Sequence, residues 1–110
     1  MAAWDETSGK AEWQMRSSQR VNSRIRVAVE WKANGETLRM EGYTLNVGRT
    51  GCLAVLPLDL AITQRVQLTN LATKQSIEAT IVWRGEERPE GRELGLQLAD
   101  SKTDFWGLEF

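Results

Sequence analysis

Two short segments of the sequence carry the side chains best suited to binding an anionic, aromatic ligand. The first is Arg20-Val21-Asn22-Ser23-Arg24, which places two arginines four residues apart. A guanidinium group is planar and forked, so it suits phosphate oxygens and the O6/N7 edge of guanine, and it also stacks on flat rings. A guanine nucleotide would use all three properties.

The second segment, Asn46-Val47-Gly48-Arg49-Thr50-Gly51, is rich in glycine. Asn46 offers both an amide donor and an acceptor, and Gly48 and Gly51 permit close backbone approach or positive φ angles. Turns of this kind can present backbone N–H groups to an anion, and Arg49 adds a candidate phosphate contact. The candidate ligand-binding residues are therefore Arg20, Arg24, Asn46, Gly48, Arg49 and Gly51.

A β-hairpin is predicted to bring these two segments together. From Arg26 to Lys32 apolar and polar residues alternate, which is typical of a half-buried strand, and Asn34-Gly35 is a type I′ turn signal. The return strand runs from Leu38 to Val47, and its apolar phase switches at Gly42, which predicts a β-bulge there. Because one segment precedes the first strand and the other ends the second, both should lie at the same end of the hairpin.

Four more strands follow. The apolar run Cys52–Leu56 predicts a strand buried on both faces, and alternation predicts strands near residues 65–69, 77–84 and 93–98. Trp31 and Trp83 fall in phase with core residues. Short connections at 72–75 and 85–91 favour antiparallel pairing, and closure of the sheet removes exposed edges. We predict an all-β, six-stranded antiparallel β-barrel, with a short C-terminal turn or helix at 103–110 that closes one end.

Composition narrows the classes of function. The chain has 110 residues, of which 26% are charged and 41% hydrophobic, as in an ordinary globular domain. It contains no histidine, which removes the commonest general base and metal ligand. Cys52 is the single cysteine, so neither an intrachain disulfide nor a cysteine metal cluster can form. We assign no catalytic residue, no metal and no cofactor, and without a secretion or membrane signal we expect a cytoplasmic protein.

Charge and polarity divide the chain into a tail and a domain. Between Lys10 and Arg26 there are five basic residues and one acid, whereas from Glu86 onward seven acids outnumber three basic residues. DNA or RNA binding over the whole surface is therefore disfavoured, and an anionic partner should be met locally. Residues 1–19 are predicted to be a flexible tail and arm, in which Trp4 and Trp13 are available to a partner protein, and residues 20–110 to be the barrel domain.

At the level of motifs the chain resembles the PilZ family of bacterial cyclic di-GMP receptors, whose pattern is RxxxR followed by [D/N]xSxxG. Arg20-x-x-x-Arg24 and Asn46-x-Gly48-x-x-Gly51 carry the resemblance, which covers about residues 16–110 and includes Asp104-Phe105-Trp106-Gly107. It implies a barrel of this strand order, onto which Arg20 and Arg24 clamp the dinucleotide. It also implies that Asn46 recognises a guanine from the barrel surface.

The sequence departs from the family pattern at Gly48, which stands where the family has serine. A missing hydrogen bond to a polar ligand group costs about 1–3 kcal/mol. Two interpretations follow. In the first, the chain is a cyclic di-GMP effector in which ligand binding orders the arm from Met15 to Arg26. In the second, it is a degenerate PilZ-like protein-interaction module that binds no nucleotide. Binding of single-stranded nucleic acid is a weaker alternative, because aromatic and basic residues are not interleaved on any strand.

Overall fold

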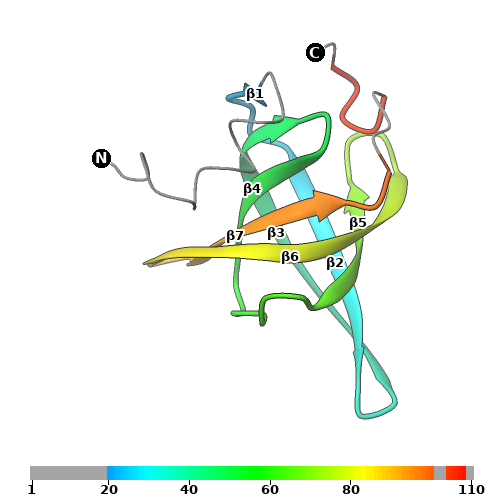
Figure 1. Ribbon diagram of the computed structural model, residues 1–110, viewed down its shortest axis with the longest axis vertical. Coiled ribbons are helices and arrows are strands. Elements are labelled where there is room, and N and C mark those ends of the chain that lie inside the picture. The colour runs from blue at the N-terminus through cyan, green and yellow to red at the C-terminus, as the bar shows by residue number, and fades with distance from the viewer. Residues whose placement is uncertain (1–19, 101–103, 109–110) are drawn as a thin grey trace.

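The computed structural model describes residues 20–100 and 104–108, and within these ranges the chain consists of strands and turns (Figure 1). The strands are β1 (Arg20–Val21), β2 (Arg26–Ala33), β3 (Glu36–Gly48), β4 (Gly51–Leu56), β5 (Arg65–Asn70), β6 (Gln75–Arg88) and β7 (Gly91–Leu98).

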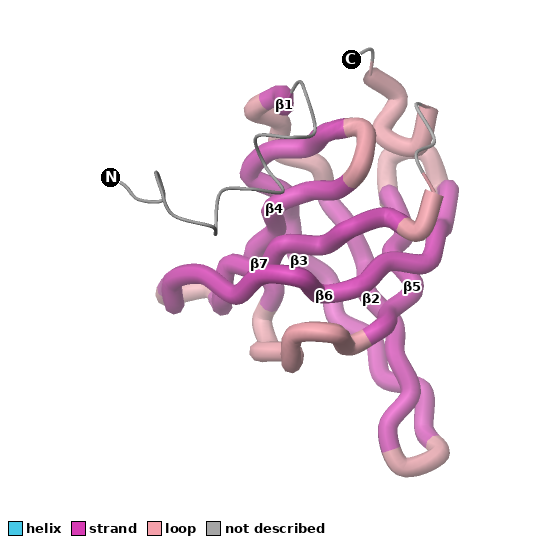
Figure 2. Tube along the Cα trace, in the orientation of Figure 1, coloured by secondary structure: helices cyan, strands magenta, loops and turns pink. Residues whose placement is uncertain are grey.

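Six of these strands close into a barrel. The sheet order is β1-β3-β2-β5-β6-β7-β4, all pairings are antiparallel, and β3 also pairs with β4 (Figure 2). The predicted all-β, six-stranded antiparallel barrel is therefore confirmed. β1 is an additional strand that the sequence did not predict. It pairs with Val47 and Gly48 on the edge of β3 that β4 leaves open, beyond the point where β2 pairing ends.

The β2–β3 hairpin sets the register of the site. Asn34 and Gly35 have φ angles of 53° and 79°, as the predicted type I′ turn requires. This turn places Trp31 opposite Leu38 and Arg26 opposite Tyr43. The tip of the hairpin projects beyond the body of the barrel (Figure 1).

The barrel interior is filled by one apolar cluster to which six of the strands contribute alternate side chains. Trp31 belongs to this cluster, as predicted. The segment 104–108 forms a turn that buries Phe105 and Trp106 at one end of the barrel, and the Gly107 amide donates to Asp104 O at 3.2 Å. The predicted closure by the C-terminal segment is thus confirmed for these residues, as a turn.

The predicted bulge at Gly42 is wrong. Gly42 stays in register opposite Val27, and the irregularity lies between Thr44 and Asn46 in the pairing of β3 with β4. Glycine is required at position 42 for a different reason, because a Cβ atom there would lie 2.1 Å from Val55 O. Thr44 keeps the inward phase of Met40 and is 0% exposed, and the extra residue after it brings Val47 inward as well.

This bulge decides which residues of β3 face outward. Thr44 and Val47 pair with Ala54 and Cys52, two members of the core cluster. Tyr43 and Asn46 pair with residues of β4 outside that cluster, so they lie on the outer face of the barrel. The outward positions of β3 therefore carry an aromatic ring and the candidate amide.

The prediction that Trp83 packs in the core is also wrong. A register shift between Ile81 and Trp83 inserts one residue into β6, so Trp83 leaves the inward phase and pairs with Gly95. Its indole lies close to Gly85, where a Cβ atom would come within 2.4 Å of the ring. Trp83 is half-buried on the outer face rather than part of the core cluster.

The connection predicted at 85–91 is shorter than expected. β6 continues to Arg88 and β7 begins at Gly91, so that only two residues join the strands. Cross-strand ion pairs support this extension: Arg88 contacts Glu93 at 2.7 Å and Arg92 contacts Glu87 at 3.8 Å. Charged residues of this kind are typical of a loop in the sequence, but here they form rungs of an exposed hairpin.

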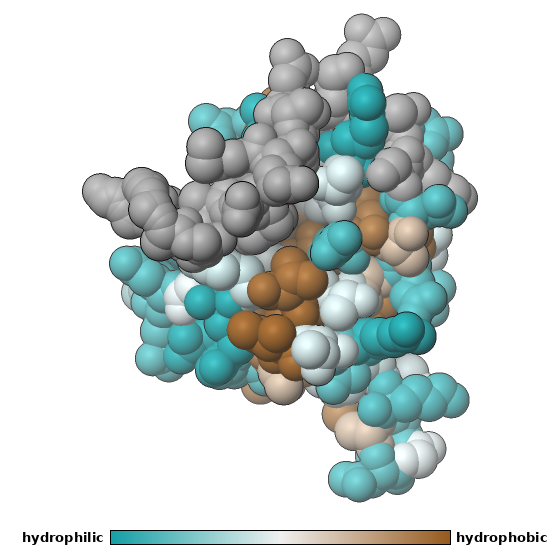
Figure 3. All heavy atoms as spheres, in the orientation of Figure 1, coloured by the Kyte–Doolittle hydropathy of each residue, from teal (hydrophilic) through white to brown (hydrophobic). Residues whose placement is uncertain are grey.

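On the face seen in Figure 3 the described residues are mainly polar, with a small apolar area. The large apolar side chains that are exposed are Leu38, Leu58 and Ile62. Leu58 and Ile62 belong to the connection between β4 and β5, which Leu60 anchors in the core. They lie outside the candidate ligand-binding segments.

Candidate functional site

Arg20 and Asn46 are held together on the outer face of β3. The Arg20 Nε and Nη2 atoms donate to Asn46 Oδ1 at 3.1 and 2.9 Å. The pairing of β1 with β3 places Arg20 opposite Gly48, so three of the predicted site residues meet at this point. Burial lowers the pKa of the Arg20 guanidinium, as expected for a cation that is partly withdrawn from water.

Arg24 is held by a residue that the sequence motifs do not include. Its guanidinium carbon lies 3.9 Å from the centroid of the Tyr43 ring, a cation–π contact. The Tyr43 hydroxyl in turn donates to Glu90 Oε2 at 3.0 Å. Tyr43 was missed because the bulge was predicted at Gly42, which assigned Tyr43 to the apolar phase of the strand. Counting from the Asn34-Gly35 turn places Tyr43 opposite Arg26 and would have revealed its proximity to Arg24.

The buried Thr44 fixes the backbone on both sides of Arg24. Its hydroxyl donates to Ser23 O at 2.6 Å and accepts from the Ile25 amide at 2.9 Å. The Thr44 amide also donates to Ile25 O at 3.0 Å. These bonds link the arm to β3, so the barrel itself determines where the Arg24 side chain starts.

The turn after β3 contains the remaining candidates. Gly48 and Gly51 pair across it, and Arg49 lies between them. The indole N–H of Trp106 donates to Gly48 O at 3.0 Å, which connects the C-terminal segment to the motif. At Gly51 a Cβ atom would lie 2.2 Å from Leu96 O, so this glycine allows the close approach of β4 and β7.

Beside Arg24 the surface is hollowed. The hollow has a volume of about 320 Å³, and its walls include Arg24, Arg26, Tyr43 and Glu90. Arg26 is engaged by Glu41 at 2.9 Å, and the carboxylate of Glu41 also accepts from Arg39, which holds its pKa below the ordinary value. The two arginines of the hollow therefore differ: Arg26 forms an ion pair with a carboxylate, whereas the side chain of Arg24 contacts an aromatic ring.

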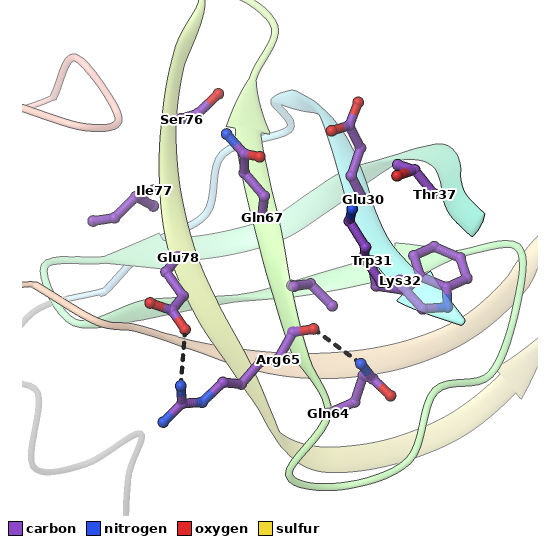
Figure 4. A pocket seen from close by; sticks show the side chains of 11 residues that line it. Glu30, Trp31, Lys32, Thr37, Gln64, Arg65, Gln67, Ser76, Ile77 and Glu78 are labelled. Carbon is purple, nitrogen blue, oxygen red and sulfur yellow. Dashed lines mark hydrogen bonds and ion pairs between the residues drawn. The ribbon is translucent and has the colours of Figure 1, made fainter. Parts of the chain in front are cut away.

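A larger groove, of about 780 Å³, lies on β2, β5 and β6 (Figure 4). None of the predicted site residues lines it. Its arginine, Arg65, is paired with Glu78 at 3.3 Å. Volume alone would favour this groove, but the cations and the amide suited to an anionic nucleotide lie at β1 and β3.

Other kinds of site have little support in the part of the chain that the structure describes. No group of three or more cysteine, aspartate or glutamate side chains there is arranged to hold a metal ion. Cys52 is buried, and burial raises the pKa of its thiol to about 12, so it is a protonated core residue. None of the described residues forms a helix long and apolar enough to cross a membrane.

Comparison with known proteins identifies the family. The family model described as the PilZ domain matches residues 14–104, a range that spans all seven strands and both candidate segments. No match is found among curated proteins or among solved structures. Since the match covers most of the sequence, the chain belongs to the PilZ domain family.

Proposed function

We propose that this chain is a cyclic di-GMP effector domain, in which Arg20 and Arg24 clamp the dinucleotide against the outer face of β3. PilZ domains are generally cyclic di-GMP-binding domains, and they act by binding rather than by catalysis. The proposal extends this family property to the two arginines of this chain, and it assigns no catalytic role to any residue. The cytoplasmic location predicted from the sequence is part of the same proposal.

The observation that carries the proposal is the position of the two arginines. Both lie against β3, where Arg20 contacts Asn46 and Arg24 contacts Tyr43. Phosphate oxygens of the ligand would offer these guanidinium groups an anionic, bidentate acceptor in place of a neutral amide oxygen and an aromatic ring. Asn46 accepts from Arg20 through Oδ1, and its Nδ2 atom is a donor for a guanine acceptor. In this proposal Arg49 adds a phosphate contact beside Gly48 and Gly51.

For the described part of the arm we propose an exchange of side-chain contacts, in addition to the ordering of the arm from Met15 to Arg26 that the sequence suggested. From Arg20 to Arg26 the backbone is already bound to β3 through β1 and through Thr44. We therefore propose that the ligand exchanges side-chain contacts in this stretch, and that the changed surface is read by a partner protein. Trp4, Trp13 and the arm from Met15 to Gln19 lie outside the described residues.

Calorimetric titration of the protein with cyclic di-GMP tests the proposal. Arg20→Ala and Arg24→Ala should each weaken binding by about tenfold or more, because each removes hydrogen bonds to a charged ligand worth about 1.5–3 kcal/mol. Arg65→Ala is the matched control, since Arg65 lies in the groove of Figure 4 and should leave the affinity unchanged. Absence of heat at ligand concentrations of hundreds of micromolar would contradict the proposal.

One observation favours a second candidate, the protein-interaction module that binds no nucleotide. Gly48 stands where the family pattern has serine, so one hydroxyl contact is absent. Gly48→Ser should strengthen binding by about tenfold to a hundredfold if that contact is all that is missing. Two results together would favour the second candidate. A partner protein would bind equally well with and without cyclic di-GMP, and titration of the Gly48→Ser variant with cyclic di-GMP would release no heat.

A further inference from the structure

Two side chains outside the family motifs adjoin Arg24. Tyr43, on β3, lies under the guanidinium group at 3.9 Å from ring centroid to guanidinium carbon. Glu90, on the turn between β6 and β7, accepts a hydrogen bond from the Tyr43 hydroxyl at 3.0 Å. The three side chains line one hollow, although they come from three separate parts of the chain.

The charged groups in this exposed hollow influence one another. The pKa of Glu90 lies below its ordinary value, first because of a hydrogen bond with its own backbone and then because of the Tyr43 hydroxyl, with Arg88 and Arg24 acting in the same direction. Desolvation, followed by the contact with Glu90, raises the pKa of Tyr43, so its hydroxyl keeps its proton. The carboxylate of Glu90 thus lines the same hollow as Arg24, the arginine that the proposed function assigns to the ligand phosphates.

We propose that Tyr43 and Glu90 are functional residues of the ligand site. Tyr43 is the platform that positions Arg24, and Glu90 is an exposed counter-anion, supplied by the chain itself, that the ligand must displace. This inference rests on the proposed function and adds to it two residues that control affinity. The ligand class remains a phosphodiester dinucleotide.

Electrostatics gives the direction of each effect. Attraction between Glu90 and Arg24 stabilises the unliganded site, and repulsion between Glu90 and phosphate oxygens destabilises the liganded one, so both oppose binding. The Tyr43 ring acts in the opposite sense, because it holds Arg24 near the outer face of β3 before the ligand arrives. Loss of the carboxylate charge should thus strengthen binding, and loss of the ring should weaken it.

Four variants of the whole chain separate these effects in calorimetric titrations with cyclic di-GMP. Glu90→Gln should bind about three- to fivefold more tightly at low salt, with a smaller gain as salt screens the charges. Glu86→Gln is the control, because it removes an exposed charge from the same hairpin outside the hollow. Tyr43→Leu should bind about fivefold more weakly, whereas Tyr43→Phe keeps the ring and should bind at least as well as the wild-type chain.

Each outcome has a defined meaning. The inference is overturned if Glu90→Gln binds no better than Glu86→Gln, or if Tyr43→Leu binds as tightly as Tyr43→Phe. In either case, binding of cyclic di-GMP by the wild-type chain would still support the proposed function. If neither the wild-type chain nor any variant binds, both fail together. Circular dichroism of each variant confirms that the barrel is folded before its affinity is compared.

Discussion

At the scale of single residues, Thr44 holds the backbone on both sides of Arg24 against β3. It occupies an inward position between apolar neighbours, where valine would fill the space equally well, yet its hydroxyl bonds to Ser23 O and to the Ile25 amide. The sequence motifs predicted Arg20, Arg24 and Asn46 as site residues, but they contain no sign of Thr44, Tyr43 or Glu90. Thr44 and Tyr43 were missed because the bulge was predicted at Gly42, and local alternation places a bulge only to within a few residues. Glu90 was missed because the charged ends of β6 and β7 resemble a polar loop in the sequence.

Thr44→Val should reduce both stability and affinity. The free energy of unfolding should fall by about 1–3 kcal/mol, because the Ile25 amide and Ser23 O lose their partner while valine keeps the volume. Urea denaturation measures this change, and cyclic di-GMP titration should show weaker binding because Arg24 is less well positioned.

The matched control is Thr69→Val, which removes an exposed hydroxyl that pairs with Ser76. Its effect on the free energy of unfolding should stay within about 0.5 kcal/mol. Equal effects of the two substitutions on stability and affinity would contradict the role given to Thr44.

At the scale of elements, the C-terminal turn and the end of β3 form one unit. The amide of Asn70 donates to Phe105 O at 2.8 Å, and the Trp106 indole donates to Gly48 O at 3.0 Å. The apolar character of the C-terminal segment was enough to predict that it closes the barrel. Its attachment to Gly48 was not predictable, because residues 58 positions apart are joined only by the closed fold. β1 was missed because a strand of two residues is too short to show an alternation of apolar and polar side chains.

Trp106→Phe tests this connection. It leaves the carbonyl of Gly48 without its indole donor in a buried place, so the free energy of unfolding should fall by about 1–3 kcal/mol beyond the loss of ring volume. Trp31→Phe makes the same substitution at another position of the core cluster and is the control for the lost ring volume. Equal urea midpoints for the two variants would show that the hydrogen bond contributes nothing.

At the scale of the whole molecule, period-two alternation, the Asn34-Gly35 turn and the short connections were sufficient to predict a six-stranded barrel. They could not show that β6 and β7 extend into an exposed hairpin, because its charged rungs are indistinguishable from a polar loop in the sequence. Closure of the barrel also buries the thiol of Cys52 completely at the inner face of β4.

This burial predicts how stability depends on pH. Desolvation raises the pKa of Cys52 from 9.0 to about 12. The thiol of the unfolded chain therefore ionises at a lower pH than the thiol of the folded chain. The stabilisation is complete below pH 9 and is lost as the pH rises toward 12, by up to about 1.4 kcal/mol per pH unit. Urea denaturation across pH 9 should show a steeper alkaline loss for the wild-type chain than for Cys52→Ala, whereas parallel curves would contradict the prediction.

The central claim, that cyclic di-GMP binds at the arm and the end of β3, is tested most directly by nuclear magnetic resonance of the isotopically labelled protein. Addition of the dinucleotide should shift backbone amide signals in 20–26 and 43–51 and leave those of β5 in place. An unchanged spectrum, or shifts confined to the groove lined by β2, β5 and β6, would contradict the account.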